Sequence, residues 1–193
     1  MLALLYPYEY VESAFAIDYE RLYENGYRAL IFDIDNTLVP HGADATAQTD
    51  ALLQQLQARG FQTFILSNNG VARIERFIQN VPMPYLNNAK KPLPFSYRKA
   101  LKALGVNRKQ AVFIGDQVFT DILGANLSGM ASILVKYIGY YEAGAKGKRR
   151  DTEAKILARY QASTRYTHRC TPPMTGSPSF PTSPTNNAGR TTR

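Results

Sequence analysis

The sequence predicts an α/β protein built on a doubly wound sheet of five parallel strands. Short apolar runs alternate along the chain with amphipathic segments of about ten residues, a pattern typical of parallel βαβ units. The chain has 193 residues, 45% of them hydrophobic and 20% charged, which suits one globular domain with its own core. Its one cysteine excludes an internal disulfide framework and a zinc site made of several cysteines.

Each predicted strand is a short apolar run bounded by polar or turn-forming residues. The first, Ala29-Leu-Ile-Phe-Asp-Ile-Asp35, stays apolar until its acidic end, so we expect a buried strand. Because helix-length segments separate most of the runs, consecutive strands are expected to be parallel. The five predicted strands are 29–35, 61–66, 82–86, 110–114 and 131–135.

Most predicted helices carry their apolar residues on one face and stop at a glycine. Residues 46–59, for example, place Leu52, Leu53 and Leu56 on one face and end at Gly60. In open α/β sheets ligands bind beyond the carboxyl ends of the strands, so we expect the functional residues in the loops after the strands. The predicted helices are 46–59, 71–79, 95–104, 120–128 and 151–160.

The two ends of the chain differ from its middle. Residues 1–28 are rich in tyrosine and are expected to form a helical segment packed on the domain, with a surface that meets lipid or a partner as the alternative. Residues 161–193 are rich in Thr, Ser, Pro and Arg and poor in large apolar residues, so we expect a disordered tail. The predicted domain therefore spans residues 1–160.

The net charge of +8 fits an anionic substrate or an anionic surface, although most of these charges are expected simply to solvate the protein. No apolar run approaches the roughly 20 residues that span a bilayer. The first residues lack the basic start of a secretory signal. We therefore expect a cytoplasmic protein, with peripheral contact at the inner face of the membrane as a further option.

Acidic residues follow two of the predicted strands. Asp33 and Asp35 end the first strand and point the same way, because they are two residues apart. Asp116 and Asp121 follow the fourth strand. Carboxylates that converge repel one another unless a cation lies between them. An all-oxygen set of this kind suits Mg²⁺.

The loops after the second and third strands add groups that fit a phosphate. Ser67, Asn68 and Asn69 supply a hydroxyl and amides, and the Lys90-Lys91 pair can place an ammonium over an anion. An aspartate can accept a phosphoryl group, and a second aspartate can protonate the leaving oxygen and then activate water. Mg²⁺ and a lysine can neutralise the transferring group. The residues therefore predict a phosphoryl-transfer site.

These residues also carry a family resemblance. Asp33-x-Asp-x-Thr37, Ser67, Lys91-Pro92 and Gly115-Asp116-x4-Asp121 resemble the four motifs of the haloacid dehalogenase-like (HAD) phosphatase superfamily. Over about residues 5–138 the chain is similar to the YqeG family of subclass IIIA. The resemblance implies a three-layer Rossmannoid fold without a large cap domain, and a Mg²⁺-dependent phosphatase. The segments that carry the YqeG resemblance are Phe32-Asp-Ile-Asp-Asn-Thr-Leu38, Leu66-Ser-Asn-Asn69, Ala89-Lys-Lys-Pro92 and Ile114-Gly-Asp-Gln117.

The resemblance implies a role for each acidic residue. Asp33 is expected to be the nucleophile and a metal ligand. Asp35 is expected to be the general acid/base, and its backbone carbonyl to bind the metal. Asp116 is expected to be a metal ligand. Asp121 is expected to lie outside the ligand set and to hold Lys91 or a metal-bound water, with capping of the following helix as the alternative.

The resemblance implies that Thr37, Ser67, Asn68 and Lys91 bind the substrate, with Lys91 also taking part in catalysis. Thr37 is further expected to orient the loop that carries the two aspartates, and the backbone at Asn68 to help Ser67 bind the phosphoryl group.

The spacing of the motifs leaves no room for a cap domain, since only residues 38–45 separate Thr37 from the next predicted helix. An open site suits a large or surface-borne phosphate, and the resemblance points to phosphatidylglycerophosphate as a candidate lipid head group. Two alternatives remain: a non-enzymatic regulatory or anionic-partner-binding protein on the same fold, and a nucleic-acid end phosphatase. Nucleic acid ranks lower because no aromatic-basic strand motif is present. The oligomeric state stays open.

Overall fold

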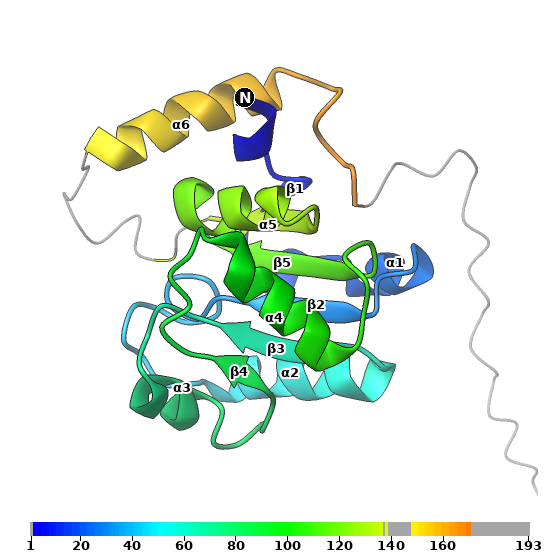
Figure 1. Cartoon of the computed structure of the whole chain (residues 1–193), viewed down its shortest axis with the longest axis vertical. Coiled ribbons are helices and arrows are strands. Elements are labelled where there is room, and N and C mark those ends of the chain that lie inside the picture. The colour runs from blue at the N-terminus through cyan, green and yellow to red at the C-terminus, as the bar shows by residue number, and fades with distance from the viewer. Residues whose placement is uncertain (1, 137, 139–147, 171–193) are drawn as a thin grey trace, which may run out of the picture.

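The computed structural model describes residues 2–136, 138 and 148–170, and in it six parallel strands form one sheet (Figure 1). No helix among these residues combines the length and apolar character needed to cross a bilayer. The strands are β1 (Glu9–Val11), β2 (Ala29–Phe32), β3 (Gln62–Leu66), β4 (Tyr85–Leu86), β5 (Ala111–Gly115) and β6 (Ala131–Val135). The α-helices are α1 (Tyr19–Glu24), α2 (Ala47–Arg59), α3 (Val71–Phe77), α4 (Pro94–Leu104), α5 (Leu123–Leu127) and α6 (Lys148–Gln161). Two 3₁₀ turns, η1 (Leu2–Leu5) and η2 (Ala14–Ala16), and a π-helical turn, η3 (Val118–Ile122), complete the described elements.

The strand order is β1-β6-β5-β2-β3-β4, which puts β2 between β3 and β5. Ile31 of β2 is in register with Phe64 of β3 and Phe113 of β5. The chain winds from β2 to β4 on one side and then crosses back to form β5 on the other. In doubly wound sheets this change of direction opens a crevice at the carboxyl ends of the strands. The fold therefore places the loops after β2 and β5 side by side.

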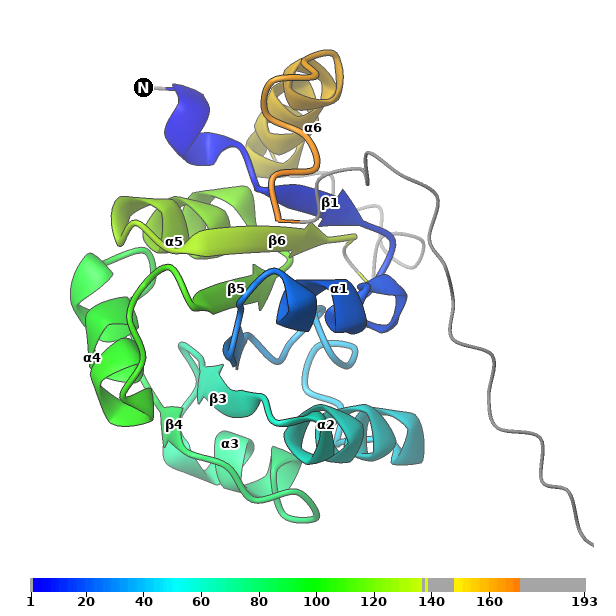
Figure 2. The same ribbon diagram turned by 90° about the vertical axis from the view of Figure 1, so that its right-hand side faces the viewer.

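Apolar side chains cover both faces of the sheet. On one face Leu30 of β2 packs in a cluster with Leu53 of α2 and Phe77 of α3. On the other face Ile31 lies in a cluster with Tyr97 of α4. Figure 2 shows α4 and α5 on one side of the sheet and α1 and α2 on the other. Burial of β2 on both faces explains why its apolar run lacks alternation, as the sequence predicts.

Most helices and strands begin and end close to where the sequence predicts. All five predicted strands are present, but β2 ends at Phe32, before Asp33 and Asp35, and β4 is only Tyr85–Leu86. Helices α2 and α4 stop at Gly60 and Gly105 as expected. Both glycines have left-handed backbone angles, φ 101° and 64°, which a residue without Cβ adopts at little cost. The predicted helix 120–128 is instead divided between η3 and α5.

A sixth strand, β1, lies in the N-terminal segment that the sequence predicts to be helical, so that prediction was incomplete. β1 pairs with β6, with Glu9 opposite Ile133. Three residues are too few to show a strand periodicity, which is why the sequence does not reveal it. Tyr6 is 8% exposed, and the Tyr23 ring lies 5.2 Å from that of Phe61. These tyrosines therefore pack on the core and do not form an exposed surface.

Residues 162–170 also differ from the expected disordered tail. The Arg169 guanidinium lies 3.8 Å from the Tyr8 ring centroid, and the Arg169 N–H donates to the Tyr8 carbonyl over 3.0 Å. Cys170 is 1% exposed. Because β1 is an edge strand, this segment covers backbone that would otherwise face solvent. The rest of the predicted tail, 171–193, lies outside the described residues.

Candidate active site

A cavity of about 130 Å³ lies where β2, β3 and β5 end. It is the crevice expected from the reversal of strand order. Five predicted site residues line it, from three separate parts of the chain, so the structure brings these motifs together. The lining residues are Asp33, Asp35, Asn36, His41, Ser67, Asn68, Asn69, Lys91, Gln117 and Thr120.

The Lys91 ammonium bridges two buried carboxylates. Its Nζ lies 2.8 Å from Asp33 Oδ1 and 2.7 Å from Asp121 Oδ1. The backbone N–H of Lys91 donates to Asn68 Oδ1 over 2.9 Å, which anchors the loop that carries the lysine. Since a buried charge is costly unless it is paired, these contacts fix the ammonium between the two acids.

The same contacts shift the pKa values of Asp33 and Lys91. Burial raises the pKa of Asp33 to about 6, against the opposing effect of Lys91, and the nearby Asp121 carboxylate adds to the rise. For Lys91, burial alone would lower the pKa, but the carboxylates of Asp121 and Asp33 outweigh it and raise the pKa. Lys91 therefore stays protonated at neutral pH.

Three buried acids form a group that fits a metal ion. Asp33, Asp116 and Asp121 each offer one carboxylate oxygen, and these oxygens lie within 4.8 Å of one another. Three carboxylates against the one ammonium of Lys91 leave an excess of negative charge, and an all-oxygen set suits a hard divalent cation. Asp121 belongs to this group of acids, although the predicted set of metal ligands does not include it. The expected ligation by the backbone carbonyl of Asp35 stays a prediction.

The Asp35 carboxylate is held by a different set of groups. It accepts hydrogen bonds from the Gly42 N–H at 2.9 Å and from the Asn69 amide at 2.6 Å, and it pairs with Arg73 at 2.9 Å. Burial would raise the pKa of Asp35, but these hydrogen bonds together hold it below its usual range. Asp35 is therefore ionised at neutral pH.

Arg73 of α3 is a site residue that the sequence analysis missed. Its Nη2 contacts Asp35 Oδ1 and also donates to the Ala43 carbonyl over 2.7 Å, so it ties the loop after β2 to α3. Its side chain is 13% exposed. The available signal was only a basic residue shortly after Ser67, and nothing local points to a partner 38 positions away.

Ser67 and Asn69 form a polar wall of the cavity. Ser67 Oγ accepts from the Asn69 backbone N–H at 3.2 Å and from the Asn69 side-chain amide at 3.0 Å. The same amide reaches Asp35. Asn69, to which the sequence analysis gave no individual role, thus links the predicted phosphate-binding hydroxyl to the second aspartate.

Four residues that the sequence singles out do not line this cavity: Asp116 and Asp121, which are buried in the acidic group beside it, and Thr37 and Lys90. Thr37 is 1% exposed, and an orienting role within the loop fits its burial, whereas its binding of substrate stays a prediction. Lys90 is exposed and lines a different cavity, which agrees with the choice of Lys91 as the motif lysine.

Gly115 makes room for Asp121. A Cβ at position 115 would lie 2.5 Å from Asp121 Cγ and 2.6 Å from Asp121 Cβ, far inside van der Waals contact. A residue with a side chain at this position would therefore push Asp121 away from Lys91.

Comparison with known proteins gives two kinds of match. A HAD-hydrolase-like family model matches residues 88–159. The Bacillus subtilis (strain 168) protein named Probable phosphatase YqeG is 31% identical over 79% of this chain and 89% of its own length. The chain belongs to the YqeG family of HAD-like phosphatases.

More distant relatives share parts of this YqeG-family chain. Glyceraldehyde 3-phosphate phosphatase from Pyrococcus furiosus is 32% identical over 47% of this chain, which spans only 41% of that relative. Among solved structures, an uncharacterized protein from Listeria monocytogenes serotype 4b is 19% identical and aligns with a TM-score of 0.49 over 70% of this chain and 99% of its own.

Gly115→Ala should lower kcat by about tenfold or more, because Asp121 and then Lys91 must move. Overpacking of this kind also costs about 1–3 kcal/mol of unfolding free energy. Turnover of an aryl phosphate and urea denaturation measure the two effects. Gly70→Ala is the matched control, since a Cβ there has no neighbour within 4 Å. Wild-type turnover by Gly115→Ala would contradict the steric argument.

Arg73→Met should lower kcat by about tenfold or more. The variant removes the cation beside Asp35 and the hydrogen bonds that connect the loop after β2 to α3. The control is Arg76→Met on the same helix. Arg76 pairs with Asp44 of the same loop, but both side chains are at least half exposed, and exposed pairs contribute little. Steady-state kinetics on an aryl phosphate compare them. Equal losses in the two variants would show that Arg73 has no special part in the site.

Proposed function

We propose that the protein is a Mg²⁺-dependent phosphomonoester hydrolase that works through an aspartyl-phosphate on Asp33. The observation that carries the proposal is the buried bridge from Asp33 through Lys91 to Asp121, next to a cavity that Asp33, Lys91 and Ser67 line. Mg²⁺ held by Asp33, Asp116 and the backbone carbonyl of Asp35 would neutralise charge on the transferring phosphoryl group.

In the first step an Asp33 carboxylate oxygen attacks phosphorus. The bond from phosphorus to the leaving oxygen breaks, and that oxygen takes a proton from Asp35. In the second step water attacks the phosphorus of the aspartyl-phosphate and gives a proton to Asp35, which frees Asp33 and releases phosphate. Lys91 and Ser67 hold the phosphoryl oxygens during both steps.

Asp35 must gain a proton before the first step, because its neighbours keep it ionised in the free site. A bound phosphate brings negative charge next to Asp35, and a nearby like charge raises the pKa of a carboxyl group. A phosphomonoester that binds as the monoanion also carries the proton that Asp35 needs. The ionised state seen in the free site suits the second step, in which Asp35 acts as a base.

The open cavity supports a large or surface-borne substrate. Residues 36–46 and 67–84 are fully described, and they form no domain over the cavity. A lipid phosphate such as phosphatidylglycerophosphate, met by a peripheral protein at the membrane surface, fits this access. The relatives named for glyceraldehyde 3-phosphate favour a small soluble phosphate ester as the second candidate.

Asp33→Asn should abolish Mg²⁺-dependent phosphate release, because the amide cannot become the phosphorylated group. The assay offers phosphatidylglycerophosphate in mixed micelles, sugar phosphates, an aryl phosphate and 5′-phosphorylated oligonucleotides, with EDTA as the metal control. Release from the lipid identifies a lipid phosphatase, and release from oligonucleotide ends alone replaces it with a nucleic-acid end phosphatase. Turnover that persists in Asp33→Asn would refute the mechanism.

Without metal, the contribution of Asp33 to protein stability should fall as the pH rises from about 4 to about 6. The folded-state pKa of Asp33 is raised to about 6 from its ordinary value, so the folded state binds more protons in this interval. Mg²⁺ needs the ionised carboxylate, so its apparent affinity should fall by up to about tenfold per pH unit below 6.

Thermal unfolding with EDTA or with titrated Mg²⁺, at pH 5 and pH 7, measures both effects. Asp33→Asn is the control for all other titrating groups. The same pH dependence in the variant as in the wild type would show that Asp33 is not the group responsible.

A further inference from the structure

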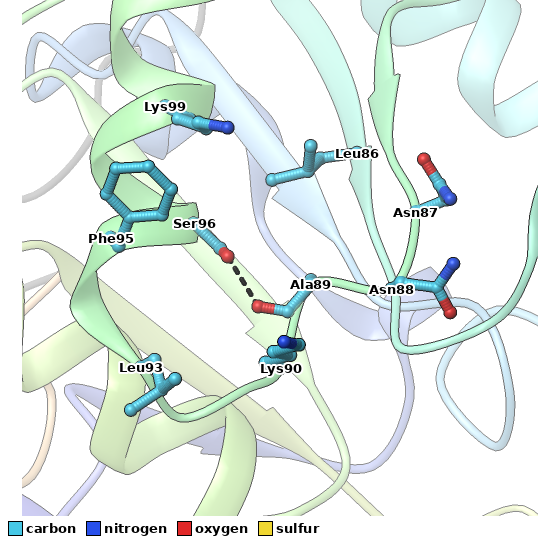
Figure 3. A pocket seen from close by; sticks show the side chains of 9 residues that line it. All are labelled: Leu86, Asn87, Asn88, Ala89, Lys90, Leu93, Phe95, Ser96 and Lys99. Atoms are coloured by element: carbon cyan, nitrogen blue, oxygen red, sulfur yellow. Dashed lines mark hydrogen bonds between the residues drawn. The ribbon is translucent and has the colours of Figure 1, made fainter.

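A second cavity, of about 280 Å³, is lined by residues 86–90 and by the start of α4 (Figure 3). Lys91 turns into the active site, whereas Lys90 lines this groove together with the start of α4. The loop is held on both sides: Asn88 N–H donates to the Asn69 carbonyl, and Ser96 donates to the Ala89 carbonyl. A single segment therefore separates the two cavities.

The rim of this groove carries exposed apolar side chains. Leu93 is 55% and Phe95 is 65% exposed, the highest values among the large hydrophobic residues that the structure describes. Both residues lie at the start of α4, beside the loop. Two large apolar side chains this exposed and this close together are unusual for a surface without a partner.

The helix next to the groove presents cations that have no carboxylate partner among the described residues, although the Lys99 ammonium lies 4.5 Å from the centroid of the Phe95 ring. Phe95, Arg98, Lys99 and Lys102 are spaced i, i+3, i+4 and i+7 and are all exposed, so they form one stripe along α4. No carboxylate within the described ranges forms an ion pair with these three cations or with Lys90. The sequence contains no Asp or Glu between Glu75 and Asp116.

Two arginines on the opposite side of the sheet do have carboxylate partners. Arg59 of α2 pairs with Glu20, and Arg76 of α3 pairs with Asp44. These arginines of α2 and α3 are therefore paired with carboxylates, whereas the cations along α4 have no carboxylate partner among the described residues.

We propose that Leu93, Phe95, Lys90 and the α4 stripe dock the protein on an anionic phospholipid bilayer. Apolar side chains that enter the head-group region within a ring of free cations are the features by which peripheral proteins bind such surfaces. Nucleic acid fits less well, because Leu93 has no ring on which a base can stack. The inference extends the proposed function, since docking brings the active-site cavity next to phosphates at the bilayer surface.

Tryptophan fluorescence tests the contact directly, because the chain contains no Trp. Phe95→Trp should show a blue shift on vesicles of phosphatidylglycerol and phosphatidylcholine, and little shift on phosphatidylcholine alone. The control is Phe15→Trp, a partly exposed site that lies in η2 outside the surface. No shift for Phe95→Trp, or equal shifts for both variants, would overturn the proposal.

Vesicle co-sedimentation measures affinity with matched double variants. Phe95→Ser/Lys99→Glu should bind anionic vesicles at least about tenfold more weakly than wild type, because each basic residue near such a surface contributes about a fivefold gain. Phe15→Ser/Lys109→Glu makes the same changes of residue type and net charge elsewhere and should bind like wild type. Equal losses would assign any binding to net charge alone and refute the docking surface.

Aryl phosphate turnover separates this proposal from the proposed function. All four variants should hydrolyse the soluble substrate at the wild-type rate. Wild-type turnover without vesicle binding refutes the docking surface and leaves the hydrolase. Vesicle binding without any Asp33-dependent turnover refutes the hydrolase and leaves the surface. Binding to a single-stranded oligonucleotide that depends on Phe95, with none to vesicles, would reassign the surface to nucleic acid.

Discussion

The buried ion pairs of Lys91 are the interaction on which the site depends. An ammonium and two carboxylates are removed from water at the carboxyl edge of the sheet, and each is tolerated there only because the others are present. The fold supplies the conditions for this contact. β2 and β5 are neighbours, so Asp33 and Asp116 start from adjacent strand ends, and Gly115 leaves the space that Asp121 fills.

Asp33 and Asp35 are two residues apart, and the structure gives them opposite environments. Asp33 lies in a buried group of acids, where desolvation raises its pKa. Asp35 lies among hydrogen-bond donors from its own loop, from the loop after β3 and from α3, which lower its pKa. Paired titratable groups whose surroundings separate their pKa values are typical of sites that divide a reaction between two roles. Gly42 of the same loop, Asn69 after β3 and Arg73 of α3 together provide this separation, so the catalytic loop depends on α3 as well as on its own sequence.

Much of this arrangement could be predicted from sequence because it is local. The strands are apolar runs, and the acids and Ser67 directly follow them, so topology alone brings them to one edge. What the sequence did not reveal depends on contacts between distant segments. β1 is a three-residue strand that pairs with β6, and residues 162–170 contact β1 and the residue before it through Cys170 and Arg169. The Arg73 contact requires a particular placement of α3 beside a loop, which periodicity does not encode.

Basic side chains lie on both sides of the active-site cavity, but those on one side are paired with acceptors of the protein and those on the other are not. Towards α3, the guanidinium of Arg73 is bound to a carboxylate and a carbonyl, and its effect is to hold a loop still. Towards α4, Lys90 and Lys99 have no carboxylate partner in the described part of the chain, and Lys99 contacts only the face of the Phe95 ring, so their charge is available to a ligand outside the protein. A cation already neutralised cannot attract a distant anion, and a free cation cannot position a neighbouring loop. The distribution of acids along the chain, absent from 76 to 115, therefore separates the part of the surface that builds the site from the part that can bind an anionic surface.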